Sequence, residues 1–72
     1  MTSIIIGKIG KILSGDEQGK FIKIIDDRDT GGFIILTGED REFHHSYDNW
    51  VEDETALLYY FRESHWLIEW SK

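Results

Sequence analysis

Residues 39–54 gather the side chains most suited to recognising a charged partner. Seven carboxylates there stand against Arg41 alone, which gives −6 and equals the formal net charge of the whole chain. Tyr47 and Trp50 lie among these acids. An acidic surface set around aromatic anchors is the type of surface that docks a basic protein. We therefore predict a partner-binding face made of Glu39, Asp40, Glu42, Tyr47, Asp48, Trp50, Glu52, Asp53 and Glu54. The alternative is a solvated loop followed by acids that begin a helix.

Metal binding is not predicted. His44 and His45 are adjacent, so on a strand they would point to opposite faces, and no spacing of zinc ligands includes His65. The Asp-Asp-Arg-Asp run at 26–29 resembles the start of a calcium loop, but Glu39 falls one position too late to close it. The sequence thus predicts no metal and no cofactor. Because carboxylates surround the histidines, we expect raised histidine pKa values and pH-sensitive docking.

The composition also argues against several function classes. The chain has no cysteine nucleophile, no Gly-x-Ser-x-Gly elbow and no glycine-rich phosphate loop, so we predict a protein that is not an enzyme. A pI near 4.8 disfavours nucleic acid, whose phosphates need clustered Lys and Arg. There is no apolar run of membrane-spanning length and no signal-peptide pattern, and cysteine is absent. These features favour a cytoplasmic protein.

The elements that must position the acidic residues begin with strands separated by polar, glycine-containing turns. The 72 residues suffice for a single domain, 1–72, whose three Trp, three Tyr and four Phe can supply much of the core. Apolar runs predict strands at 3–13, 21–25 and 33–37. The last of these is apolar on both faces, which is typical of a central strand. Residues 42–46 fit either a short edge strand or a loop.

A helix and a closing strand follow. Ala56, Leu57, Tyr60 and Phe61 share one helical stripe, which predicts a helix over about 50–63. Asp48, Asn49 or Asp53 could be its N-cap.

Residues 66–70 alternate as a final strand, with Trp66, Ile68 and Trp70 on one face. We expect the helix to cover this face; left uncovered, it would form a dimer interface. The order β-β-β-(β)-α-β predicts an α+β fold, a small antiparallel sheet with one helix. An all-β, SH3-like barrel, with residues 56–61 as a strand, is the alternative.

Three strings resemble those of small, poorly characterised bacterial proteins. They are Thr-Gly-Gly-Phe-Ile-Ile-Leu (30–36), Tyr-Asp-Asn-Trp-Val-Glu (47–52) and Tyr-Phe-Arg-Glu-Ser-His-Trp-Leu-Ile-Glu-Trp (60–70). The strings bring no activity with them. In size, acidity and aromatic content the chain also resembles bacterial immunity proteins, which neutralise basic toxin domains. That likeness implies a basic protein partner and maps no binding residues onto this chain.

Two functions follow as predictions. The first is a bacterial protein-binding module, in its most specific form an immunity or inhibitor protein that docks a basic partner through residues 39–54. The second is a small structural or regulatory domain that self-associates through its aromatic face. The expected state is a monomer or a weak homodimer, with no nucleic acid or membrane partner.

Overall fold

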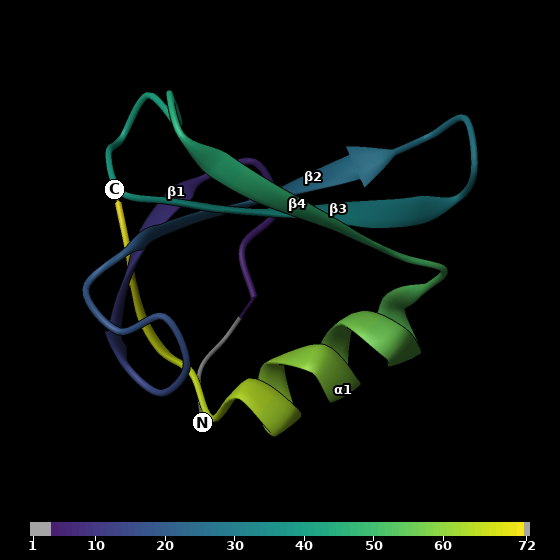
Figure 1. The fold of residues 1–72 in the computed structure, drawn as a ribbon. Helices are drawn as coiled ribbons and strands as arrows, with labels where there is room; N and C mark the ends of the chain where they lie inside the picture. Colours follow the sequence, from purple (N-terminus) through teal and green to yellow (C-terminus); the bar gives the residue numbers. More distant parts are fainter. Residues whose placement is uncertain (1–3, 72) are drawn as a thin grey trace.

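The computed structural model describes residues 4–71, which form one open antiparallel sheet and one helix (Figure 1). The elements are β1 (Ile9–Ser14), β2 (Phe21–Asp27), β3 (Gly32–Gly38), β4 (Ser46–Val51), α1 (Glu54–Ser64) and β5 (Leu67–Trp70). The strand order is β4-β3-β2-β1-β5, so β4 and β5 are the edges. The predicted α+β fold and its element order are confirmed. The SH3-like barrel is wrong, because the sheet does not close and residues 56–61 are helical.

Helix α1 begins at Glu54, four residues later than the sequence predicted. Asp53 is its N-cap, and the Asp53 carboxylate accepts a hydrogen bond of 2.8 Å from the backbone N–H of Ala56. Of the caps considered, Asp53 is therefore the one used. The helix ends at a left-handed His65, whose N–H bonds back to the carbonyls of the last turn. The predicted stripe is correct in its buried members, Leu57 and Phe61.

Two strands, β1 and β4, differ from the prediction by more than two residues at one end or both. Strand β1 begins at Ile9, since Gly7 has a positive φ of 84° and turns the chain before it; of the predicted 3–13, residue 3 lies outside the described part. Residues 42–45 are loop, and β4 occupies 46–51 instead. Its pairing with β3 runs from Val51 to Ser46 without a break. This pairing removes residues 50 and 51 from the predicted helix.

The core lies between the sheet and α1. Ile12, Ile22, Ile24 and Ile35 are fully buried. Leu57 and Phe61 pack onto them from the helix, and Trp66 and Ile68 pack from the segment that returns to the sheet. The buried core consists of nine residues: Ile12, Ile22, Ile24, Phe33, Ile35, Leu57, Phe61, Trp66 and Ile68. The helix therefore covers the Trp66–Ile68–Trp70 face, as predicted.

The other side of the sheet has no helix over it (Figure 1). Side chains alternate across a strand, so the residues between the core positions point to this side. We call it the open face; its apolar members are Ile9, Leu13, Phe21, Ile25, Ile34, Leu36, Trp50 and Leu67. None of the eight is fully buried. Among residues 4–71 there is no helix long and apolar enough to span a membrane.

Candidate partner-binding surface

Strand β4 forms one edge of the sheet and carries the middle of the acidic stretch. One side of β4 pairs with β3, and no strand within residues 4–71 pairs with its other side. Five of its six residues are exposed. Tyr47 is 72% exposed and Trp50 is 54% exposed, although large aromatic side chains usually bury more of their area. An unprotected edge strand is a ready template for an added strand.

The β4 side chains divide between the two faces of the sheet. Tyr47 and Asn49 point to the helix side, where the Asn49 amide donates a 3.1 Å hydrogen bond to the Tyr60 hydroxyl. Asp48 and Trp50 point to the open face. The nine predicted site residues consequently do not form one flat face. They follow the edge of β4, with side chains on both faces of the sheet.

Trp50 is held in place by the β2–β3 turn. Its indole N–H donates a 2.9 Å hydrogen bond to the Thr30 hydroxyl. The ring lies against Gly32, where a Cβ would come within 2.7 Å of the indole nitrogen. A glycine at 32 is thus what lets the ring rest on β3. An ordered, half-exposed aromatic side chain has little entropy left to lose when it is buried by a partner.

The seven acids fall at the two ends of β4 and at its centre. Glu39, Asp40 and Glu42 lie in the loop before the strand. Glu52 and Asp53 lie in the turn after it, and Glu54 opens α1. Six residues of strand separate the two groups, a span of about 17 Å. The arrangement is an edge of free backbone groups with negative charge at both ends.

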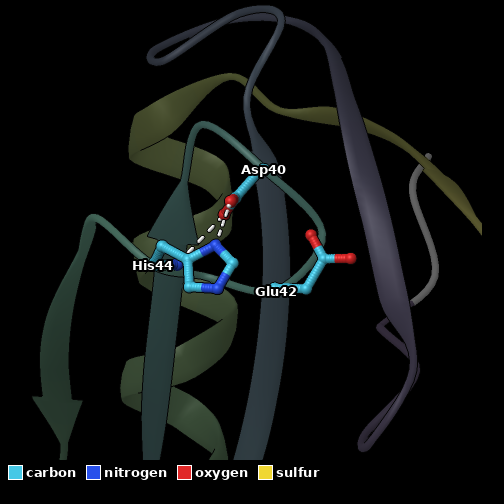
Figure 2. A group of neighbouring side chains, drawn as sticks. All are labelled: Asp40, Glu42 and His44. Carbon is cyan, nitrogen blue, oxygen red and sulfur yellow. Dashed lines mark hydrogen bonds and ion pairs between the residues drawn. The ribbon is translucent and has the colours of Figure 1, made fainter.

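Asp40 has a structural role in the loop (Figure 2). Its carboxylate accepts a 3.0 Å hydrogen bond from the backbone N–H of His44, and its second oxygen lies 2.6 Å from Nδ1 of the same residue. The hydrogen bond to Asp40 raises the pKa of His44 above its ordinary 6.5. The same bond lowers the pKa of Asp40 below its ordinary 3.8. The predicted rise in pKa is therefore found at His44.

Asp53, as the helix N-cap, is the second acid with a local partner. The two ion pairs among the described residues are Lys20–Glu17 and His44–Asp40. The remaining acids of the stretch make no ion pair within residues 4–71, and all of them are exposed: Glu39, Glu42, Asp48, Glu52 and Glu54. These five are the carboxylates available to a partner.

One grouping was not expected from the sequence. Ligand atoms of Asp40, Glu42 and His44 all lie within 4.8 Å of one another. The spacing i, i+2, i+4 in a loop is the only signal, and it matches no zinc or calcium pattern. Figure 2 shows contacts between Asp40 and His44 and none to Glu42. A metal ion would have to compete with the Asp40–His44 pair at an exposed site, so we assign no metal here.

No protein-family model, curated protein or solved structure matches this chain. The resemblance to small bacterial proteins and to immunity proteins therefore stays a prediction.

Proposed function

We propose that this protein acts by binding a basic protein through strand β4 and the acids at its two ends. The observation that carries the proposal is the free edge of β4, which presents two exposed aromatic side chains, Tyr47 and Trp50. An extended segment of the partner would add to the sheet as a further strand. Its backbone hydrogen bonds would supply affinity, and alternate side chains would contact Tyr47 on one face and Trp50 on the other.

Charge would select the partner. Lys or Arg side chains near both ends of the added segment would meet Glu39 and Glu42 at one end of β4 and Glu52 and Glu54 at the other. Complementary charge accelerates association and disfavours acidic competitors. These pairs would be partly exposed, so added salt should weaken the complex.

The most specific form of the proposal is an inhibitor of the immunity type, in the cytoplasm of a bacterium. The partner would then be a toxin domain with a basic cleft, and the carboxylates would occupy positions meant for phosphate groups. Inhibition by occlusion needs no catalytic residue in the inhibitor, in keeping with the prediction that the protein is not an enzyme.

A comparison of three baits tests the proposal. The native chain, a Glu42→Lys/Glu52→Lys variant and a control would each be exposed to lysate of the native host and eluted in steps of rising salt. The control, Glu63→Lys/Glu69→Lys, makes the same change in net charge on α1 and on β5, which is the opposite edge of the sheet from β4.

A basic protein that the native and control baits retain and the Glu42/Glu52 variant loses would support the proposal. Two reversed charges should weaken binding by about 3 kcal/mol, roughly 100-fold. Equal retention on all three baits would refute the role given to the β4 acids.

A further inference from the structure

The open face carries more apolar surface than a solvated sheet face needs. One side of an antiparallel sheet commonly faces water, and its outward positions are then polar. Here eight outward positions are apolar. Leu13, Trp50 and Leu67 are 41%, 54% and 50% exposed. Contiguous apolar surface rimmed by polar groups marks an interaction site.

One corner of the open face is occupied by the chain itself. Arg41 lies 5.2 Å from the Phe21 ring centroid, and Lys11 lies 5.9 Å from it. A Cβ at Gly38 would lie 3.0 Å from the Phe43 ring, which places Phe43 above β3 at this corner. Away from this corner, Trp50, Ile34 and Ile25 lie in one apolar row across β4, β3 and β2.

The charges of the open face indicate what covers it. Three cations and three anions point to this side: Lys11, Lys23, Arg41, Asp27, Asp48 and Glu69. These six charges balance one another, and Asp40 and Glu42 lie in the same loop as Arg41. A partner of one strong charge would meet both signs on such a mixed surface and gain little from it. A two-fold interface, in contrast, puts the same patch on both sides and needs both signs in it.

We propose that the open faces of two copies of this chain pack against each other. The result would be a sandwich of two sheets about 10 Å apart, with a helix on each outer side. Five strands of this length cover about 24 Å by 20 Å. The two faces together come to about 960 Å², below the roughly 1,200 Å² at which stable complexes begin and within the range of weak, transient ones, so the expected dissociation constant is micromolar or weaker. Lys23 of one copy would lie near acids such as Asp48 of the other.

This interface differs from the one proposed for the basic partner, although the two share Asp48 and Trp50. It uses side chains of β1, β2, β3 and β5 together with Asp48 and Trp50, and it leaves the backbone edge of β4 free. The two proposals also differ in their response to salt. Since each copy carries −6, screening reduces their mutual repulsion while apolar contacts persist. Dimerisation should therefore survive or strengthen at about 0.5 M salt, where binding of a basic partner weakens.

Sedimentation equilibrium of the native chain from about 1 to 500 µM tests the dimer. The expected result is a mass that rises from 8.5 kDa towards twice that value, 17 kDa. Ile34→Lys places a charge between Trp50 and Ile25 on the open face and should weaken association roughly tenfold or more. Leu58→Lys is the matched control, because Leu58 is 60% exposed on the helix and lies away from the open face.

Circular dichroism would show whether Ile34→Lys remains folded. If it does not, Leu67→Lys takes its place, since Leu67 lies at the exposed rim of the same face. A mass of 8.5 kDa at every concentration would overturn the proposal, and so would equal weakening by Leu58→Lys. Neither result would alter the three-bait comparison, so failure of this proposal is distinguishable from failure of the β4 proposal.

Discussion

Replacing Gly15 by alanine should destabilise the fold much more than the same replacement at Gly19. The two glycines have nearly the same backbone conformation, with φ of 98° and 91°. At Gly15 an added Cβ would contact the backbone oxygens of Ser64 and His65, the former at 2.6 Å, whereas nothing lies within 4 Å of the corresponding position at Gly19. Backbone atoms at a helix end cannot rotate away as a flexible side chain can.

The magnitude follows from the contacts that the clash would break. A non-glycine residue in the left-handed region costs about 1–2 kcal/mol, and both variants pay it. At Gly15 the β1–β2 turn must also move away from the end of α1. Two hydrogen bonds join them: Asp16 N–H to Ser64 O at 2.9 Å and the Trp66 indole N–H to Asp16 O at 2.6 Å. At about 1 kcal/mol each, their loss brings the total to about 3–4 kcal/mol.

Urea unfolding followed by tryptophan fluorescence and circular dichroism measures both variants. A domain of this size is stable by about 4–11 kcal/mol, so Gly15→Ala would remove a large fraction of that free energy. The expected difference between the variants is about 2 kcal/mol. If Gly15→Ala and Gly19→Ala lower the free energy of unfolding equally, the docking of the turn against the helix end does not stabilise the fold as described.

Three further changes have clear expectations. Asp40→Asn should lower the pKa of His44 in an NMR titration, because it removes the carboxylate that raises it; an unchanged pKa would contradict the pairing. The pKa of His44 is raised and that of Asp40 is lowered, so the pair should stabilise the loop at pH values between 3.8 and 6.5, the ordinary pKa values of the two groups. This stabilisation should be lost as the pH rises through the folded pKa of His44, and also as the pH falls through the folded pKa of Asp40. Asp53→Ala should cost about 1 kcal/mol in urea unfolding, and Glu52→Ala, one residue earlier, close to nothing; equal losses would argue against the cap. Phe61→Ala should cost about 3–5 kcal/mol by leaving a core cavity, and a loss below 1 kcal/mol would contradict its place in the core.

The elements that the sequence predicted well are those with an apolar side facing the core. Strands β2 and β3 contain the buried Ile22, Ile24 and Ile35, and α1 contains the Leu57–Phe61 stripe. The buried side of a strand needs an apolar residue at every second position, and the buried side of a helix needs one at every third or fourth position. This spacing can be read from the sequence without knowing which elements pack against it.

The fourth strand was expected at 42–46 and lies at 46–51 instead, because an edge strand leaves little such pattern. It contributes only Val51 to the surroundings of the core, and its Asp48 and Asn49 are also good helix N-caps. Its strand conformation depends on pairing with β3, which is a tertiary contact. The late start of α1 is the other consequence of the same pairing.

The position of the charge was predictable, but its division into roles was not. The order of residues alone shows that the excess of carboxylates lies in residues 39–54. Whether an acid meets a partner or supports the fold depends on which N–H groups lie within reach. That geometry assigns Asp40 to the loop and Asp53 to the helix cap. The open face could not be predicted either. A strand that is apolar on both sides predicts that both faces of the sheet are covered, but it does not say what covers the second face.

Amide hydrogen exchange of the complex with a recovered basic partner tests the binding of β4 most directly. The free chain should exchange the outward-facing amides of Ser46–Val51 quickly, because no strand within residues 4–71 bonds to that edge. Strand addition predicts that these amides become slow in the complex, with little change in α1. Unchanged exchange in β4, together with new protection confined to another surface, would contradict the proposal that this edge is the binding site.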